Sequence, residues 1–413
     1  MSSTWKSAIP VIAIVSAINF INMVAFVLVM PMGPDFSNAL DMPIEMIGIV
    51  AGIFTLTSSI TSLMTAPILD RFVKHELLFY LVLGFSVAMM LTGFAWNVNS
   101  LLFFRALAGV FGGPMSAIAI AYLTDATPEY FRGRAFAIVM AMFSIASIVG
   151  VPIGLELALR YTWSTPFFVI GACGVFVAVL TFIVGRYYAR QHIKTQIKNP
   201  RFGYQMAFQN RVYRLAFMGN FLVFFAAFLL IPHISSYMQL MLNVPREEIS
   251  MLYFWAGLVT LFSINLTGWL IDKLSVIPIL TFASILLSFT IYSGYARTDL
   301  WSPLMLFIAT MVLMSIRSIS AQTFSSVIPQ PDHRSGFMAI NTAMQHFSVA
   351  VGAAMSSWIL SESTDEKMVG MPELSYLSMV LMLCIPPLFT LIQWRHQRMK
   401  LQINREKAEG IKP

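Results

Sequence analysis

Long uncharged, apolar runs recur along this chain and alternate with short polar connectors. Twelve runs have about 20 residues or more, the length that an α-helix needs to cross the hydrocarbon core of a bilayer. They cover residues 7–34, 46–69, 77–104, 106–124, 135–155, 161–185, 215–245, 249–271, 274–296, 300–331, 335–361 and 374–394, with Arg317 as a charge inside the tenth. Backbone amides in lipid must be hydrogen-bonded within their own segment, and the alternation typical of a membrane barrel is absent. The sequence therefore predicts an all-α polytopic membrane protein with twelve transmembrane helices.

Composition supports this interpretation, because 58% of the residues are hydrophobic, 11% are charged and the mean hydropathy is +0.75. The first run is too long for the core of a signal peptide, so we expect it to be retained. Cys173 and Cys384 fall inside predicted helices, where packing is favoured over a disulfide or a metal site. The sequence contains neither a metal-ligand cluster nor a nucleotide-binding motif. We therefore expect no metal, no cofactor and no enzymatic activity.

The net charge of +7 has to be weighed as a signal for nucleic-acid binding. If the N-terminus is cytoplasmic, 20 of the 26 Lys and Arg residues lie in cytoplasmic segments and four lie in external loops. This asymmetry is the one that the positive-inside rule describes, so the basic excess indicates topology and not nucleic acid. We expect both termini to be cytoplasmic and the protein to lie in a bacterial inner membrane.

The longest polar segment, between the sixth and seventh runs, divides the chain in two. It carries seven basic residues and no acid between Arg186 and Arg214. An amphipathic helix on anionic headgroups and a solvated connector are both compatible with it. We predict a first bundle over residues 1–185, a cytoplasmic linker over 186–211, a second bundle over 212–394 and a cytoplasmic tail over 395–413.

The two predicted bundles repeat each other. The connector after the second run reads APILDRFVK and the one after the eighth reads GWLIDKLS, which places Asp70 and Asp272 202 residues apart. The connectors after the fourth and tenth runs place Gly133 and Gly336 203 residues apart. Two pairs of matching connectors with almost the same separation indicate a parallel duplication of six helices. The two halves would be related by an axis along the membrane normal and would enclose a site near the midplane.

These connectors resemble motif A of the major facilitator superfamily, and the resemblance covers nearly the whole chain. Asp70 and Arg71 are kept, Val73 stands where the family has glycine, and Lys74 stands where it usually has arginine. The second half holds an abbreviated copy with Asp272 and Lys273.

Two further motifs add to the resemblance. Arg105 and Gly109 match motif B in the fourth run. Gly150, Pro152 and Gly154 match part of motif C, which in the family accompanies exporters, especially drug and proton antiporters.

The resemblance implies a secondary transporter whose two halves rock around a central cavity between helices 1, 4, 7 and 10. It implies a gate on the cytoplasmic side, where Asp70 meets the helix that starts near Gly336 and Lys74 pairs with Asp125. Helix N-termini carry a partial positive charge that suits such a carboxylate. The alternative for these charges is that they are ordinary positive-inside anchors.

Charges within the membrane are costly, so Arg105 and Arg317 are the main candidates for contacts with a substrate or a coupling carboxylate. They could instead bond exposed carbonyl groups. Asn19 and Asn22 share one face of the first helix, as Asn341 and Gln345 do of the eleventh, and such amides either line a site or join helices.

Proton coupling needs a titratable group, and no acid lies at the middle of a predicted helix. The nearest candidates are Glu156, Asp35 and His346, of which the histidine could instead be a packing residue.

Gly109 with Gly113, and Gly150 with Gly154, form flat patches that permit close helix approach, and Pro152 allows a bend. The second patch could be a stiff seam between the halves or simple helix packing.

The predicted function is export of a drug or small metabolite, coupled to protons, by a monomer in the lipid bilayer. Two alternatives stay open: import or facilitated diffusion of a nutrient, sugar or siderophore, and a membrane sensor or assembly factor that does not transport.

Overall fold

The computed structural model describes residues 3–69, 72–128, 131–191, 209–296, 301–329, 334–362 and 368–408. The first half contains α1 (Ser3–Val27), η1 (Met30–Met32), α2 (Gly33–Leu40), η2 (Ile44–Met46), α3 (Ile47–Leu69), α4 (Lys74–Gly93), α5 (Val98–Ala126), α6 (Arg132–Ile145), η4 (Ala146–Gly150), α7 (Val151–Arg160) and α8 (Thr165–Gln191). The second half contains α10 (Arg211–Phe228), α11 (Ile231–Leu240), η5 (Arg246–Glu248), α12 (Ile249–Leu274), α13 (Val276–Ile291), η6 (Tyr292–Ala296), α14 (Pro303–Ser326), α15 (Arg334–Ile359), β1 (Ser361–Glu362), β2 (Met368–Val369) and α16 (Met371–Ala408).

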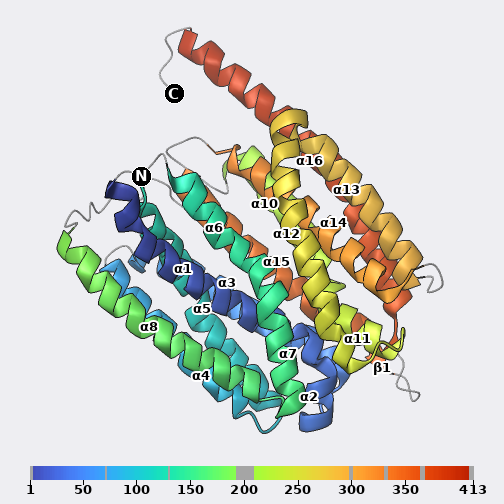
Figure 1. Cartoon of the computed structure of the whole chain (residues 1–413). Helices are drawn as coiled ribbons and strands as arrows, with labels where there is room; N and C mark the ends of the chain where they lie inside the picture. Colours follow the sequence, from blue (N-terminus) through green and yellow to red (C-terminus); the bar gives the residue numbers. More distant parts are fainter. Residues whose placement is uncertain are drawn as a thin grey trace.

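The two halves lie side by side as two groups of long helices, blue to green and yellow to red in Figure 1. The start of α1 and the end of α16 lie toward one end of the molecule, here named the terminal side, and α2 and α11 lie toward the other end, the far side (Figure 1). In the described part of the chain, eleven helical segments are long and apolar enough to cross a membrane. The predicted all-α polytopic architecture is confirmed.

The helix α15 is absent from those eleven although it has 26 residues and packs along α3 and α10. It is the helix of the predicted eleventh run, and its hydropathy is lowered by Asn341, Gln345 and His346. A helix that packs against helices of both halves exposes less surface to lipid, so it tolerates more polar residues than a peripheral helix.

Prolines divide two of the predicted uncharged runs. The first run forms α1 and then the short helices η1 and α2, which have Pro31 and Pro34 in their first turns. The seventh run ends α10 at Phe228 and restarts as α11 with Pro232 in its first turn. Proline lacks an N–H and is accepted where a helix begins, so each run turns at the far side and adds a short helix there.

Two short strands, β1 and β2, form an antiparallel ribbon between α15 and α16, which the sequence did not predict. The predicted bend near Pro152 coincides with the π-helical turn η4, which ends at Gly150. A π turn is one of the usual causes of a local bend in a helix.

Two predicted helix ends fall short of the observed ones. The helix α8 continues past residue 185 to Gln191, and α16 continues past Trp394 to Ala408. Charged residues end the apolar run, but Arg, Lys, Gln and Glu are good helix formers and the helix continues through them. The remaining linker, residues 192–208, and the tail beyond Ala408 lie outside the described residues. The amphipathic and solvated interpretations of the linker therefore both stay open.

Cys173 in α8 and Cys384 in α16 are free and exposed. The expectation that they serve packing is wrong, because both side chains are exposed.

The helices α3 and α15, one from each half, approach each other closely. A Cβ atom added at Gly48 would overlap the carbonyl oxygen of Ala353, and one added at Gly52 would lie 3.0 Å from that of Ala350. Lower along the same pair, Ser59 donates a hydrogen bond of 2.8 Å to the carbonyl of Ala343. Glycine at these positions lets two backbones from different halves touch.

We expect Gly48→Ala to lower the apparent melting temperature of the purified protein in detergent, because the added methyl group would force α3 and α15 apart. Overpacking of this kind costs about 1–3 kcal/mol. The matched control is Gly133→Ala in α6, where nothing lies within 4 Å of the added Cβ. Equal melting temperatures for the two variants would contradict the contact.

Candidate functional site

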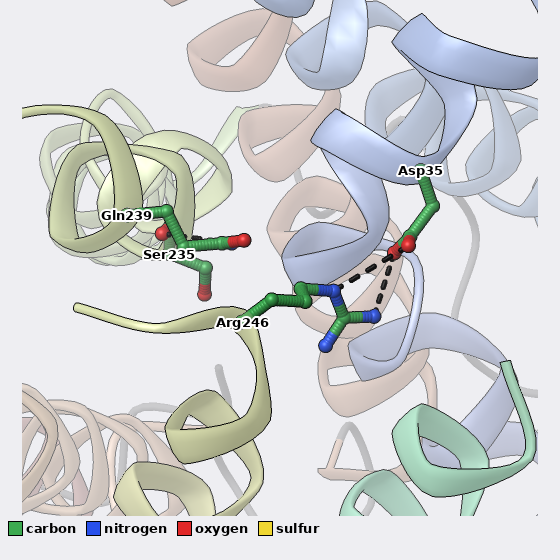
Figure 2. Close-up of polar contacts among 4 residues, drawn as sticks. All are labelled: Asp35, Ser235, Gln239 and Arg246. Carbon is green, nitrogen blue, oxygen red and sulfur yellow. Dashed lines mark hydrogen bonds and ion pairs between the residues drawn. The ribbon is translucent and has the colours of Figure 1, made fainter. Parts of the chain in front are cut away.

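An ion pair joins the halves at the far side. Asp35 in α2 accepts hydrogen bonds from Arg246 in η5, at 2.6 Å from Nη2 and 3.4 Å from Nε. Figure 2 shows the guanidinium group of Arg246 reaching across to this carboxylate, with Ser235 and Gln239 of α11 nearby. The side chains of Arg246 and Asp35 are 18% and 22% exposed, so solvent screens the pair only in part. Asp35, predicted as a coupling acid, is therefore used here to hold the two halves together.

The short helix α11 fills the far side between the halves. Its residues His233, Ser235 and Ser236 are fully buried. An added Cβ at Gly33 of α2 would lie 2.9 Å from Ser236 Oγ, so α11 contacts the first half directly. His233 Nε2 lies 2.9 Å from Ser356 Oγ of α15. Sequence reasoning missed His233, although a histidine directly after a proline inside an uncharged run was a readable signal.

Aromatic side chains continue this contact toward the middle of the molecule. Phe26 of α1 packs on Phe228 of α10, with ring centroids 5.9 Å apart, and on Phe54 of α3 at 6.1 Å. Aromatic pairs at these separations add to the area that they bury. The far ends of the first and seventh predicted helices are thus packed together, and the far side is closed in this structure.

At the terminal side, the predicted contact between Lys74 and Asp125 is present as an ion pair within the first half. Asp70 and Arg71 lie outside the described residues, so their predicted contacts stay predictions. Gly336 lies near the start of α15, as expected for the helix that Asp70 would face.

The second copy of the motif lies at the end of α12. Lys273 stacks on Trp269, with Nζ 3.9 Å from the ring centroid. Asp272 lies beside it in the last turn of the helix.

Two arginines are completely buried inside the helical bundles. Arg105 of α5 donates from Nη1 to the carbonyl of Ala25 in α1 at 3.1 Å and lies 4.8 Å above the ring of Phe54. Arg317 of α14 donates from Nη2 to the carbonyl of Val223 in α10 at 3.0 Å. Each guanidinium group keeps two nitrogen atoms without a hydrogen-bond partner among the described residues. Both charges thus have donors to spare for another ligand.

The two arginines use the same helix pairing in each half but lie at different depths. Arg105 is seven residues into α5, or about 10 Å from its far end, whereas Arg317 is fourteen residues into α14, or about 21 Å from its far end. Among the described residues, neither arginine forms an ion pair with a carboxylate.

The polar residues of the first helix join helices. Asn19 donates to the carbonyl of Val139 in α6 at 2.7 Å, and Asn22 donates to Ser116 Oγ in α5 at 3.0 Å. Of the two readings left open for these amides, the observed bonds match the joining of helices.

The polar side chains of the eleventh predicted helix, α15, have fewer hydrogen-bond partners. Neither polar atom of the Asn341 side chain has a partner among the described residues, and the same holds for Nδ1 of His346. Gln345 is partly buried beside them. These side chains stay candidates for a polar site along α15.

Glu156 does not fit the coupling role predicted for it. It pairs with Arg160 one turn further along α7 at 2.5 Å, and the two side chains are 46% and 70% exposed. Exposed pairs spaced i, i+4 on a helix are common and contribute little.

The glycine patches pack helices within the first half. Cβ atoms added at Gly109 and Gly113 of α5 would overlap backbone carbonyls of α3. A Cβ atom added at Gly150 would meet Val24 of α1, and one added at Gly154 would meet Leu28, the residue after α1. Of the two interpretations left open for Gly150 and Gly154, these contacts match helix packing within the first half.

The seam on this part of the chain uses Ser147 and Ile148, which meet Gly257 of α12 in the other half. An added Cβ at Gly257 would lie 2.8 Å from Ile148. The small residue that permits this contact thus comes from the second half.

These features define a polytopic membrane protein of two helical halves, closed at one side, with buried unpaired cations between its helices. The sequence pattern of the Major Facilitator Superfamily matches residues 15–353 and 216–409. The chain belongs to the Major Facilitator Superfamily.

Curated relatives include transporters with export in their names. Multidrug resistance protein 1 of Bacillus subtilis is 28% identical over 48% of this chain and 51% of its own length. A probable sugar efflux transporter of Mannheimia succiniciproducens is 26% identical over 37% of this chain and 38% of its own. The efflux pump azaK of Aspergillus niger is 30% identical over 32% of this chain and 29% of its own. The matches therefore span from about three tenths to about half of these relatives.

Solved structures share the fold over almost the whole chain. A bacterial homologue of the human lysosomal transporter Spinster, solved in an inward-facing and occupied conformation, has a TM-score of 0.72 and 15% identity over 95% of this chain and 98% of its own. The D-xylose-proton symporter has a TM-score of 0.70 and 12% identity over 92% and 97%. At such identities the likeness establishes the fold.

We expect Asp35→Asn and Arg246→Gln each to loosen the far side, because each leaves the other partner of the ion pair uncompensated. The readout is maleimide labelling of Ser236→Cys in a background with Cys173→Ser and Cys384→Ser. Each variant should label roughly fivefold faster, which corresponds to about 1 kcal/mol.

The double variant should label no faster than either single variant, since the pair can be broken only once. The matched control is Glu156→Gln, which breaks an ion pair within one half and should leave the labelling rate unchanged. Additive effects of Asp35→Asn and Arg246→Gln would show that the two residues act separately.

Proposed function

We propose that this protein exports a small molecule, a drug or a metabolite, in exchange for protons, by alternating access between its two halves. The observation that carries the proposal is the set of contacts across the halves at the far side: the pair of Asp35 with Arg246 and the backbone contact at Gly48. These contacts must break for a binding site between the halves to open to that side. Breaking and remaking them while a second closure forms at the terminal side is the alternating access described for this class of fold.

The proposed orientation follows from charge. The terminal side carries most of the Lys and Arg residues, so it is assigned to the cytoplasm and the far side to the exterior. A multi-pass protein with this orientation in a bacterial inner membrane would have both termini inside, and we propose that it works as a monomer with one bundle over residues 1–185 and the other over 212–394.

Arg105 and Arg317 are proposed to act on the cargo or on the coupling ion. Each is buried, each has one carbonyl partner, and each retains donors without partners among the described residues. An unpaired charge in a membrane interior is costly, so such residues ordinarily serve a ligand or a pathway. The names of the relatives, which refer to efflux and multidrug resistance, support export as the direction.

The proposed inner closure uses Asp70, Arg71 and Lys74 with Asp125 and the start of α15. The hydrogen bond from Ser59 to Ala343 supports this assignment through the helix register. The helix α3 ends at Leu69, ten residues beyond Ser59, and α15 begins at Arg334, nine residues before Ala343. At 1.5 Å per residue in antiparallel helices, these two ends lie at about the same level.

The test of transport uses everted membrane vesicles acidified by respiration and challenged with a panel of cationic drugs, organic anions, sugars and amino acids. A compound that releases the pH gradient only when the protein is present would support proton-coupled export and give the class of cargo. Arg105→Ala and Arg317→Ala should each lower that response at least tenfold, because the buried guanidinium donors are lost. Arg186→Ala, which removes a cation at the end of α8, is the control. If the arginine variants respond like the wild type, the proposed role of these residues is wrong.

We expect Asp70→Asn to slow the same response at equal expression, because a neutral amide is a weaker partner for a helix N-terminus than a carboxylate. The matched control is Glu76→Gln, the same change at an acid in the first turn of α4. Wild-type rates with Asp70→Asn would remove this residue from the proposed inner closure.

A further inference from the structure

The buried histidine of α11 lies in the contact between the halves and has no part in the function proposed so far. His233 is 0% exposed and belongs to the short helix that fills the far side. Its Nε2 lies 2.9 Å from Ser356 Oγ of α15, and its Nδ1 has no hydrogen-bond partner among the described residues. A buried polar atom without a hydrogen-bond partner is uncommon in folded proteins and often has a functional role.

The hydrogen bonds around Ser356 fix the state of the imidazole ring. Ser356 Oγ donates its single proton to the carbonyl of Ala353 at 2.8 Å. It must therefore accept from His233, so Nε2 carries the ring proton and Nδ1 presents a bare lone pair. The neutral ring thus has its donor satisfied and keeps a basic nitrogen free to take a proton.

The same atoms lie at the closest contact between the halves. The Ala353 carbonyl that accepts from Ser356 is the one that an added Cβ at Gly48 would overlap. An added Cβ at Gly48 would also lie 3.0 Å from Ser356 Oγ. The chain from His233 through Ser356 and Ala353 to Gly48 thus leads from a titratable ring to the backbone of the other half.

Among the described residues, no hydrogen bond or ion pair joins this ring to a carboxylate. The helices η1 and α3 have no titratable side chain. The one acid of α2, Asp35, is engaged with Arg246, itself a cation of η5. The remaining titratable or charged groups on the elements around α11 are Tyr237 of α11, Tyr253 of α12 with Asp272 and Lys273 at its opposite end, the exposed Glu247 and Glu248 of η5, Tyr292 and Tyr295 of η6, Arg211, Tyr213 and Arg214 at the opposite end of α10, and Arg334 and His346 of α15.

We propose that His233 is a proton-binding site whose occupation opens the far side. Adding a proton to Nδ1 creates a cation with a second N–H that has no acceptor while the halves are packed. A buried, unpaired charge is costly, so the protonated ring favours an arrangement in which water or a polar group reaches Nδ1. Separation of α11 and α15 from α3 provides that access, so protons favour the state that is open at the far side.

This inference rests on the proposed alternation between the halves and adds the group that senses the proton. His233 joins Glu156, Asp35 and His346 as a candidate for proton coupling. Glu156 is in an exposed ion pair and Asp35 is in the ion pair between the halves. His346 lies ten residues from Ser356 along α15. Ten helical residues are about 15 Å, which places His346 well below the far-side contact.

The experiment measures the separation of the halves directly. Spin labels are attached at Asn38→Cys in α2 and Glu247→Cys in η5, both exposed at the far side, in a background with Cys173→Ser and Cys384→Ser. The distance distribution is recorded in lipid nanodiscs from about pH 8 to about pH 5.5, a range in which histidine changes charge and ordinary carboxylates stay ionised. Lowering the pH should shift the labels to longer distances.

His233→Gln should abolish this shift and keep the short distances, since glutamine can donate to Ser356 but cannot take a proton. His75→Gln, in the first turn of α4 within the first half, is the matched control and should keep the wild-type response. His233→Asn serves as a second neutral variant if the first does not fold, and the wild-type titration stands by itself. A wild type without a pH response, or a response that survives in a folded His233 variant, overturns the proposal.

The outcomes separate this inference from the proposed function, because the labels report conformation without any cargo. A pH-dependent distance that requires His233, together with no flux for any compound of the panel, would support the proton site and count against export. Flux that is intact in vesicles, together with distances that ignore pH, would support transport and reject His233.

Discussion

The backbone contact between α3 and α15 is the constraint on which the observed state of the molecule depends. Gly48 and Gly52 allow carbonyl groups of α15 to approach α3 without intervening side chains. Because lipid gives no hydrophobic drive for helices to associate, such close van der Waals packing is a main source of attraction between them. The ion pair of Asp35 with Arg246 and the buried helix α11 lie at the same side of the molecule. Both depend on the distance between the halves that the contact of α3 with α15 fixes.

The charged groups of the molecule divide into ion pairs near the two sides and buried groups between them. Asp125 pairs with Lys74 at the terminal side, and Asp35 pairs with Arg246 at the far side. Two arginines and His233 are buried, and a single carbonyl or hydroxyl group is the hydrogen-bond partner of each among the described residues. A region of this kind attracts negative charge and water whenever the halves part, which gives the buried cations an influence on the balance between states.

Much of the fold could be predicted from the sequence, because uncharged length and the distribution of Lys and Arg are local properties. The helical architecture followed from those lengths, and the pair of Lys74 with Asp125 followed from the family resemblance. The far-side helices did not, because Pro34 and Pro232 turn the chain within uncharged runs that hydropathy alone joins together. The partners of Asp35 and of Gly150 could not be read either, since they depend on which helices become neighbours. His233 was missed because its significance comes from Ser356, 123 residues away.

The continuous helix α16 connects the membrane region to the solvent beyond it. Between Trp394 and Ala408 it extends for fourteen residues, about 21 Å, and Figure 1 shows this red segment projecting past the other helices. Because the projecting part has no loop at its base, it moves as a lever with the second half. A rigid tilt of that half by about 10° would displace the lever's tip by about 4 Å, which follows from the rise of an α-helix. The projecting end of α16 therefore converts a small rotation inside the bilayer into a displacement of several ångströms outside it.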